Sequence, residues 1–477
     1  MLRRRDVLAM PFFLQAPRAT DARIEEVEFS YADYLYRAPY KFGGKEVDRV
    51  TMLNVHCRIS GKNGGTANGF AAMPLGNVWA FPAPEIPYET TLAAMKSLAA
   101  KIARLTKEYR EYGHPLDANR ALEPEYLKAA DEVTREMKLR RPVPKLCTLV
   151  TASPFDAAIH DAYGRLHGRN SFETAGREFV HFDLSHYLNG EFRGEYLDPY
   201  ILRAPAPRIR MYHSVGASDP LTAAEVNKPI HDGLPETLEE WIPYSGVTAI
   251  KIKLNGNDLG WDVDRVAEID RVTTAAQRKR SFSGWIYSLD FNERCPNVEY
   301  LLAFERRLKE KAPAAFPLVQ YIEQPTQRDL AANPKNTMFE AAKLRPVVID
   351  ESLTGLDALL LARQMGYTGV ALKACKGQSQ SLLLAAAAQK YKMFRCVQDL
   401  TCPGAALVQS VGIACHVPGV NALEANAREY VPSANRGWEK AFPGIFDVRD
   451  GYLKTAGLGG VGLCTDRRPA TEVDAGR

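Results

Sequence analysis

The sequence predicts an α/β protein made of an α+β domain followed by a parallel β/α barrel. Two observations lead to this prediction. From about Arg208 onward, eight short strand-like runs alternate with helix-like segments, and neighbouring parallel strands need long crossovers of this kind. Before that point the strand-like runs come first and the helices follow. An open, doubly wound sheet is the alternative arrangement for the second part.

The first part, residues 22–207, begins with strand-like runs between residues 23 and 71, separated by a long polar loop rich in glycine and aromatic residues. A helix is predicted in TLAAMKSLAAKIARLTKEY, where apolar residues recur at helical spacing. A second, buried helix is predicted in SPFDAAIHDAYGRLHGRN, which is rich in small residues and ends at Gly168. This order of elements predicts the α+β domain.

The second part, residues 208–477, contains the predicted barrel strands and a C-terminal tail. The strands are RIRMYHS, VTAIKIKL, GWIYSLD, LVQYIE, PVVID, GVALK, MFRCVQ and VNALE. Amphipathic segments lie between them, such as VEYLLAFERRLKEK, whose apolar residues share one face: Val298, Leu301, Leu302 and Leu308. Near the C-terminus, GLGGVG has the spacing of a dinucleotide-binding loop. No helix or βαβ unit follows it, so we predict turns.

Residues 1–21 are predicted to lie outside the fold. They contain three arginines followed by a short apolar stretch from Val7 to Leu14. Arg4 and Arg5, with the residues after them, resemble a twin-arginine export signal, which would place the protein in the periplasm. A basic tail on a cytoplasmic protein is the alternative. No stretch reaches the roughly 18 continuous apolar residues that a membrane span needs.

Composition excludes several function classes. The chain has 61 basic and 57 acidic residues and no long basic run, so nucleic acid is not an expected partner. None of the eight cysteines forms a C-x-x-C pair, which predicts buried apolar positions instead of disulfides or a zinc site. The histidines form no H-x-H or H-E-x-x-H motif, which argues against a zinc hydrolase barrel.

Charged and polar residues end the predicted barrel strands. In YIEQPT, Pro325 cannot donate a hydrogen bond to a neighbouring strand, so the strand ends close to Glu323. The other strands, from the second onward, end in a similar way: Lys253, Asp290, Asp350, Lys373, Gln398 or Asp399, and Glu424. Parallel barrels gather these ends at one face, where they carry active sites. We therefore expect these side chains to lie together.

Three consecutive strands end in the carboxylates of Asp290, Glu323 and Asp350. Carboxylates in one mouth repel and raise one another's pKa unless a cation is present. Oxygen ligands without histidine or cysteine suit a hard cation, which predicts Mg²⁺, with Mn²⁺ as a substitute. The alternative is three solvated acids that never meet.

The strand IKIKL carries two lysines, Lys251 and Lys253, on one face. Its isoleucines must meet the outer helices, so both lysines are expected to face the barrel lumen. Two adjacent buried ammonium groups would lower each other's pKa toward neutrality and produce a general base. Lys373 ends a strand on the other side of the barrel and would serve the opposite face of a substrate. Such lysines beside a hard cation suit removal of a proton next to a carboxylate.

Taken in order, the motifs KIK, DFN, IEQP, IDES, VALK and ALEAN resemble the enolase superfamily, specifically its muconate-lactonizing-enzyme subgroup. The helix DAAIHDAYGRLHG is similar to one at the junction of the two domains in that superfamily. The resemblance covers the chain from about Ala22 to about Gly462. It implies an N-terminal capping domain and a modified TIM barrel of the (β/α)₇β type.

The resemblance also implies roles for the strand-end residues. Asp290, Glu323 and Asp350 would bind Mg²⁺. Lys253 would be the base, Lys251 would tune it, and Lys373 would be the acid or base on the other face. Glu424, with Asn426 and Asp399 nearby, would hold the substrate, and the capping loop from about Tyr34 to Gly44 would help to close the site.

The chain departs from its relatives at two points. Dipeptide epimerases of the subgroup carry D-x-D on the last strand, where this chain has Glu424-Ala-Asn426, so a dipeptide substrate is not expected. The segments from Lys253 to Asp290 and on to Glu323 are long, which predicts insertions in the outer helices or loops.

The leading interpretation is a racemase or epimerase of a small carboxylate, using Lys253 and Lys373. A dehydratase or a cycloisomerase acting on an acid or a sugar acid at the same site is an alternative, and so is an exported barrel that binds a ligand without catalysis. The sequence leaves the substrate and the oligomeric state open, a homo-oligomer included.

Overall fold

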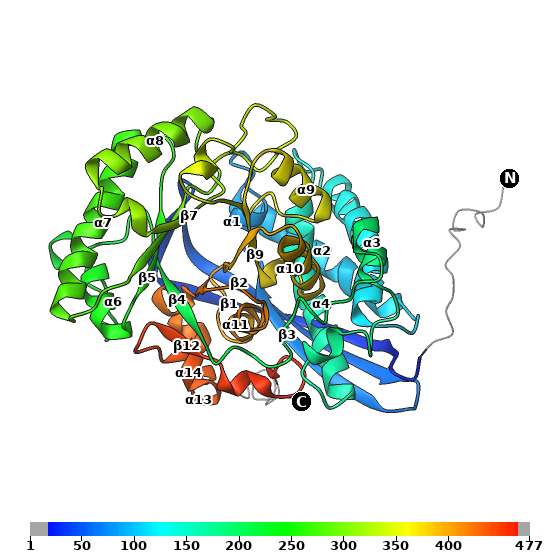
Figure 1. The fold of residues 1–477 in the computed structure, drawn as a ribbon. Helices are drawn as coiled ribbons and strands as arrows, with labels where there is room; N and C mark the ends of the chain where they lie inside the picture. Colours follow the sequence, from blue (N-terminus) through cyan, green and yellow to red (C-terminus); the bar gives the residue numbers. More distant parts are fainter. Residues whose placement is uncertain (1–17, 466–477) are drawn as a thin grey trace.

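The computed structural model describes residues 18–465, and it places two units side by side (Figure 1). An antiparallel sheet and four helices form the N-terminal unit, and the barrel forms the other. The predicted export signal lies almost wholly outside the described residues, and the division of the chain at residues 207 and 208 remains a prediction. All eight cysteines are buried, as predicted. Within the described residues, no helix is long and apolar enough to cross a membrane.

The N-terminal capping domain is built on a long β-hairpin. Its strands are β1 (Ala22–Phe42), β2 (Lys45–Gly61) and β3 (Thr66–Pro74), in the order β1-β2-β3. Its helices are α1 (Asn77–Ala80), α2 (Tyr88–Glu108), α3 (Pro115–Glu136) and α4 (Lys145–Leu166). β3 pairs only with Met52–Ser60 of β2, so the far end of the hairpin extends beyond the sheet, toward the barrel (Figure 1). The predicted capping loop is mostly strand: the pairing of β1 with β2 is interrupted by a bulge between Leu35 and Tyr40 and resumes as far as Phe42 and Lys45.

The barrel has eight parallel strands, all at the predicted places. They are β4 (Arg208–Val215), β5 (Ala249–Lys253), β6 (Ile286–Asp290), β7 (Val319–Glu323), β8 (Val347–Ile349), β9 (Gly369–Leu372), β10 (Phe394–Val397) and β11 (Ala422–Glu424). They pair in sequence order, and β11 pairs with β4 to close the ring, which excludes an open sheet. A short strand near the C-terminus, β12 (Tyr452–Lys454), runs antiparallel to β4.

Helices occupy six of the seven crossovers between barrel strands. They are α6 (Leu238–Ser245), α7 (Leu259–Lys279), α8 (Val298–Lys311), α9 (Leu356–Gln364), α10 (Gln378–Lys390) and α11 (Ala405–His416). Between β7 and β8 there is only one 3-10 turn, Ala341–Lys343. The long α7, with 21 residues, accounts for the predicted insertion before β6. After β11 the chain forms three single-turn helices: α12 (Ala427–Tyr430), α13 (Trp438–Ala441) and α14 (Pro443–Phe446).

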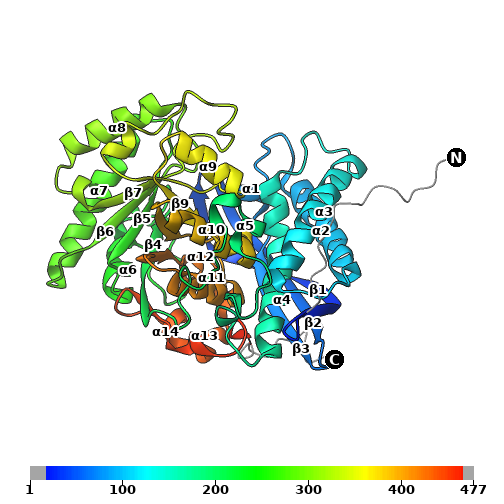
Figure 2. The same cartoon turned by 45° about the vertical axis from the view of Figure 1, so that its right-hand side comes forward.

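The helix α4 joins the two units, and it is buried along almost its whole length (Figure 2). Asp156 accepts hydrogen bonds from the backbone N–H and the hydroxyl of Ser379 in the barrel, at 2.7 and 2.6 Å. One turn later, Asp161 accepts from the backbone of Phe70 in the capping sheet and of Leu463 in the C-terminal segment. These contacts fix the capping domain relative to the barrel.

Glu305 on α8 lies on the buried face of that helix, between Leu301 and Leu308. The side chain is fully buried, and neither carboxyl oxygen has a hydrogen-bond partner. Burial raises the pKa of Glu305 to about 8, and attraction to Arg345 offsets this only in part. The folded protein therefore retains a proton that the unfolded chain releases above its ordinary pKa of about 4.3.

We expect Glu305→Gln to be as stable as the wild type near pH 5 and more stable at pH 8 to 9, by about 3–5 kcal/mol. In the wild type the folded pKa is raised, so stability falls as the pH rises from about 4.3 to about 8 and levels off above that value. Urea unfolding at several pH values measures the difference. The exposed Glu310→Gln on the same helix is the control. Parallel pH dependences of wild type and Glu305→Gln would contradict the prediction.

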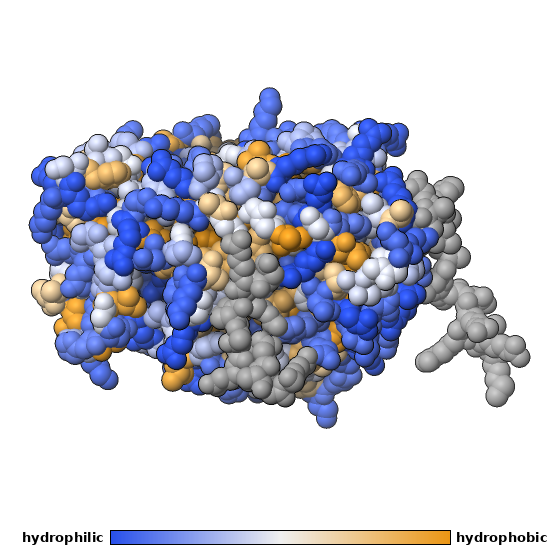
Figure 3. Space-filling model, turned by 90° about the horizontal axis from the view of Figure 1, so that it is seen from below, coloured by the Kyte–Doolittle hydropathy of each residue, from blue (hydrophilic) through white to orange (hydrophobic). Residues whose placement is uncertain are grey.

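The face of the molecule seen from below is largely hydrophilic, and small apolar areas lie between charged side chains (Figure 3). Large apolar side chains are exposed at only a few described positions, Leu35 and Phe339 foremost. Most of the buried apolar residues form one core, which extends from the capping sheet into the space between the barrel strands and their helices. A second, smaller cluster is formed by residues of the barrel strands, among them Tyr212, Ala249 and Tyr321.

Candidate active site

The structure brings the predicted strand-end residues together at one mouth of the barrel. The strand register aligns Lys253 with Asp290 and Asp290 with Glu323 across β5, β6 and β7. Asp350 follows β8 and Lys373 follows β9. All nine predicted side chains are buried: Lys251, Lys253, Asp290, Glu323, Asp350, Lys373, Asp399, Glu424 and Asn426.

Lys251 lies at the centre of this mouth. Its Nζ is 3.0 Å from a carboxylate oxygen of each of Asp290, Glu323 and Glu424. It also donates to Oε1 of Gln398 at 3.0 Å. Gln398 therefore faces the lumen at the end of β10, and Asp399 lies one position further along the chain.

The expected lowering of both lysine pKa values is wrong for Lys251. Burial by itself would lower the pKa of Lys251, but attraction to the three carboxylates outweighs it and raises the pKa above the ordinary value. Within its own strand, Lys251 has only Lys253 as a charged neighbour. The barrel closes around Lys251 and brings in carboxylates from three other strands.

Lys253 and Lys373 each pair with one of the predicted metal ligands. Nζ of Lys253 is 2.6 Å from Oδ2 of Asp290, and Nζ of Lys373 is 2.8 Å from Oδ2 of Asp350. Lys376 contacts the other carboxylate oxygen of Asp350 at 3.0 Å. Of the two lysines in KACK, Lys373 is thus the one that lines the cavity.

The carboxyl groups have very different pKa values. Burial and the nearby charge of Asp290 raise the pKa of Glu323 well above its ordinary value. Burial would raise the pKa of Asp290 as well, but Lys251 and Lys253 lower it to about 2. Burial and a neighbouring carboxylate raise the pKa of Glu351 to about 7 and that of Asp399 to about 8. The mouth thus holds more carboxyl groups than its lysines neutralise.

The donor set fits a divalent cation. Six buried carboxyl groups lie together with four buried lysine side chains, so the acidic groups outnumber the basic ones by two: Asp290, Glu323, Asp350, Glu351, Asp399 and Glu424 against Lys251, Lys253, Lys373 and Lys376. Oε2 of Glu323 is buried and has no hydrogen-bond partner within residues 18–465. In the part of the chain that the structure describes, no three His, Cys, Asp or Glu side chains stand in metal-binding geometry. The ammonium group of Lys251 stands between two of the predicted ligands instead.

Mg²⁺ is expected to raise the unfolding temperature of the wild type. A ligand that binds only the folded state adds about 2.7 kcal/mol at a concentration 100 times its Kd. Glu323→Gln should lose most of this increase, because it removes one of the three predicted ligands. Asp399→Asn, in the same mouth but outside that set, should keep it. Scanning calorimetry with MgCl₂, and with NaCl at equal ionic strength, measures both effects. An equal Mg²⁺ response in all three proteins would contradict the assignment of Glu323.

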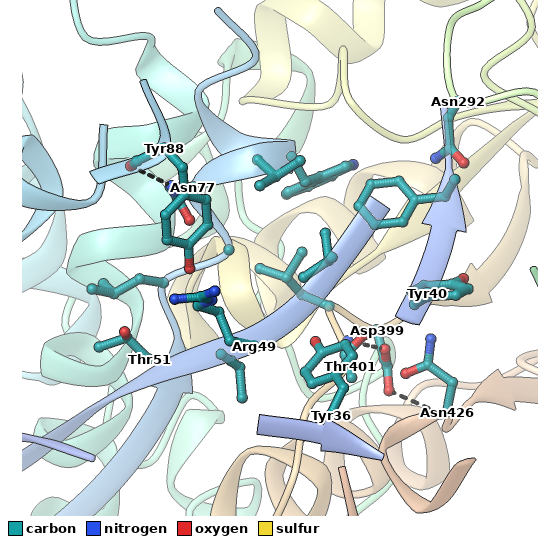
Figure 4. Close-up of a pocket in the computed structure, with 18 of the residues that line it drawn as sticks. Tyr36, Tyr40, Arg49, Thr51, Asn77, Tyr88, Asn292, Asp399, Thr401 and Asn426 are labelled. Carbon is teal, nitrogen blue, oxygen red and sulfur yellow. Dashed lines mark hydrogen bonds between the residues drawn. The ribbon is translucent and has the colours of Figure 1, made fainter. Parts of the chain in front are cut away.

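A cavity lies between the mouth and the capping domain. Lys253, Lys373 and Glu424 of the barrel line it together with Tyr36 and Tyr40 of the hairpin. Figure 4 shows Tyr36, Tyr40 and Asn426 around the cavity. Asp399 accepts hydrogen bonds from the backbone N–H groups of Thr401 and Asn426. The buried Oδ1 of Asn426 has no hydrogen-bond partner among the described residues and is available for a ligand.

Contacts with the barrel hold the hairpin in position over this cavity. The hydroxyl groups of Tyr40 and Ser214 are 3.0 Å apart. Arg37 forms a two-point ion pair with Asp232 in the loop after β4, at 2.5 and 2.7 Å. The predicted closing segment thus lies over the site, as a pair of strands.

Three residues of the mouth were not predicted. Asn292 lies two positions after Asp290 in DFN, and Glu351 directly follows Asp350 in IDES. Oε1 of Glu351 accepts a hydrogen bond from Asn292 at 3.2 Å. Trp79 comes from the capping domain, and its indole N–H donates to the same Oε1 at 2.9 Å. The motifs signal the first two residues, but no spacing rule connects Trp79 to the barrel.

Residues 234–468 match the family model described as enolase C-terminal domain-like. The match covers seven of the eight barrel strands, from β5 to β11. The barrel belongs to the enolase C-terminal domain-like family. This confirms the resemblance on which the site residues were assigned, and the closed barrel with its N-terminal sheet confirms the fold.

Solved structures share the fold of this enolase-like chain at low identity. Muconate lactonizing enzyme from Pseudomonas fluorescens, complexed with muconolactone, is 14% identical over 95% of this chain and 98% of that one, with a TM-score of 0.59. The L-Ala-D/L-Glu epimerase from Bacillus subtilis is 15% identical over 92% and 98%, with a TM-score of 0.59. N-succinyl Arg/Lys racemase from Bacillus cereus is 14% identical over 93% and 95%, with a TM-score of 0.57. No curated protein matches the sequence.

Family membership indicates an enzyme and supports Mg²⁺-dependent enolate chemistry in general terms. The structures that share the fold include cycloisomerizing, epimerizing and racemizing enzymes, so the fold alone does not select the reaction.

Proposed function

We propose that this enolase-family chain is a racemase or epimerase that moves the proton on the carbon next to a substrate carboxylate. One observation carries the proposal. Lys253 ends β5 and Lys373 follows β9, four strands apart in the closed ring of eight, and both side chains line one cavity. Two lysines on opposite sides of a bound carbon are the requirement for taking a proton from one face and returning one to the other.

In one direction, neutral Lys253 takes the α-proton, so that the C–H bond breaks, an N–H bond forms and the electron pair moves toward the carboxylate. The ammonium group of Lys373 then donates a proton to the opposite face of the same carbon. The two lysines exchange roles in the reverse direction. Asp290, Glu323 and Asp350 would hold Mg²⁺, which stabilises the negative charge that develops on the substrate carboxylate.

The remaining groups orient the substrate. The carboxylate of Glu424 is held by Lys251 at 3.0 Å and by the hydroxyl of Ser214 at 3.1 Å, so it occupies a fixed position in the lining of the cavity. The unpartnered Oδ1 of Asn426 offers an acceptor to a hydroxyl or N–H group of the substrate. The aromatic side chains of the hairpin cover the site and limit the access of water, which would otherwise weaken the electrostatic interactions inside it.

The experiment is proton exchange in D₂O with MgCl₂, followed by ¹H NMR. The probes are both enantiomers of N-acylated amino acids, dipeptides and sugar acids. Loss of the α-proton signal with interconversion of enantiomers is the expected result. Exchange followed by loss of water or by ring formation would instead favour the dehydratase or cycloisomerase. Ligand binding without exchange in any probe would contradict the proposal and favour a binding barrel.

A further inference from the structure

Trp79 is a capping-domain residue that reaches into the barrel mouth. Its helix α1 is only one turn long, and the buried side chain of Asn77 holds it on α2, through Tyr88 and Thr91 at 3.1 and 2.9 Å. Trp79 itself is 5% exposed. Its backbone carbonyl accepts from Arg328 of the barrel at 3.2 Å, so the residue is held from both domains.

The indole ring lies against the ammonium group of Lys373. Nζ of Lys373 is 4.1 Å from the ring centroid, well inside the range of about 6 Å for attraction between a cation and an aromatic face. The indole N–H fixes the plane of the ring, because it donates to the buried Glu351 at 2.9 Å. Asp350 holds Lys373 from another side at 2.8 Å. Lys373 is thus enclosed by a carboxylate, an aromatic face and the cavity.

The other lysine of the proposed pair has no comparable ring. Nζ of Lys253 is 5.8 Å from the ring centroid of Phe42 and 6.0 Å from that of Tyr40, at the outer limit of the interaction. The aromatic support of the two lysines is therefore unequal. A change to Trp79 should affect one face of the substrate and spare the other.

We propose that Trp79 is a positioning residue, which holds the ammonium group of Lys373 in place for proton transfer to one face of the substrate. A lysine side chain has four rotatable bonds and loses rotamer entropy when it is held in one position, so a fixed ring beside it reduces the cost of holding it there. The inference rests on the proposed function, and it adds that the capping domain helps to build the catalytic geometry of the barrel.

The test compares Trp79→Leu with Trp79→Phe, using both enantiomers of whichever probe exchanges. The enantiomer that depends on Lys373 is identified by its loss of exchange in Lys373→Ala. For that enantiomer, Trp79→Leu should lower kcat about 10- to 30-fold. Exchange through Lys253 should change less than about threefold. Trp79→Phe keeps an aromatic face and should restore most of the loss.

Two results would overturn the proposal: an equal loss on both faces, which a general structural defect would produce, or no loss on either face. Tyr391→Leu is the matched control, because it removes a ring that lies 4.0 Å from Arg363 on the outer helices. It should leave both directions unchanged.

A second measurement needs no substrate and separates this inference from the proposed function. An ammonium group on an indole face quenches its fluorescence by donating a proton to the excited ring. The emission of Trp79 is the difference between a protein that contains Trp79 and the same protein with Trp79→Phe. This difference should be larger when Lys373 is replaced by methionine than in the wild type. If no probe exchanges, the proposed function fails, and this emission still decides whether the ring holds Lys373. An unchanged emission would overturn the contact.

Discussion

Replacing Lys253 or Lys373 by alanine is expected to slow proton exchange by a factor on the order of 10² to 10⁴. Each replacement should affect one enantiomer of the substrate, and the two replacements should affect opposite enantiomers. The reason is geometric. The two lysines line one cavity from opposite sides of the barrel, so each has access to one face of the substrate carbon. The direct measurement is the initial rate of α-proton loss from each pure enantiomer in D₂O. The two single variants should show opposite preferences for the enantiomers, and the double variant should exchange neither.

Lys390→Ala is the control for this prediction. Lys390 lies on the outer helix α10, where it pairs with Glu195 outside the barrel mouth. Its replacement should leave both exchange rates unchanged. Retention of exchange with both enantiomers in Lys253→Ala would show that this lysine is not a base. Loss of both in each single variant would point to one shared function for the two lysines, such as binding of the substrate carboxylate.

Replacing Lys251 by methionine is expected to destabilise the folded protein by about 3–5 kcal/mol in the absence of metal. Lys251 is fully buried and is the shared counter-charge of Asp290, Glu323 and Glu424, each at 3.0 Å. Methionine fills a similar volume but leaves three buried carboxylates without that charge. Because Mg²⁺ would supply positive charge at the same place, it should stabilise Lys251→Met more than the wild type. Urea unfolding with and without MgCl₂ measures both effects.

The control for Lys251 is Lys279→Met, which breaks the exposed ion pair with Glu239. Exposed pairs contribute only about 0–1 kcal/mol, so this variant should unfold like the wild type, with or without Mg²⁺. If Lys251→Met were as stable as the wild type without metal, the buried carboxylates would have to be protonated in the folded state. That outcome would contradict a role for Lys251 as their counter-charge.

Much of the barrel was predictable because its signals are local. Each strand is a short apolar run, and each is separated from the next by a helical segment or a long loop. The positions of Asp290, Glu323 and Asp350 at strand ends follow from the same local pattern. Because parallel strands in a closed barrel all point the same way, their ends must meet. The residues of the site could therefore be predicted without knowledge of any long-range contact.

The electrostatics of the mouth were not predictable in the same way. The pKa of Lys251 depends on carboxylates that lie 39, 72 and 173 residues further along the chain, at Asp290, Glu323 and Glu424. The sequence shows only its neighbour Lys253, which would shift the pKa in the opposite direction.

The sequence by itself determined the fold class, the family and the residues at the barrel mouth, because these depend on periodicity within short segments and on ordered motifs. Only the tertiary structure decided how the capping domain completes the site. The β-hairpin reaches the cavity through a long paired extension, and Trp79 contacts Lys373 although 294 positions separate them. Contacts of this kind arise when two domains dock against each other. The local sequence patterns in each domain specify its own helices and strands and contain no information about the other domain.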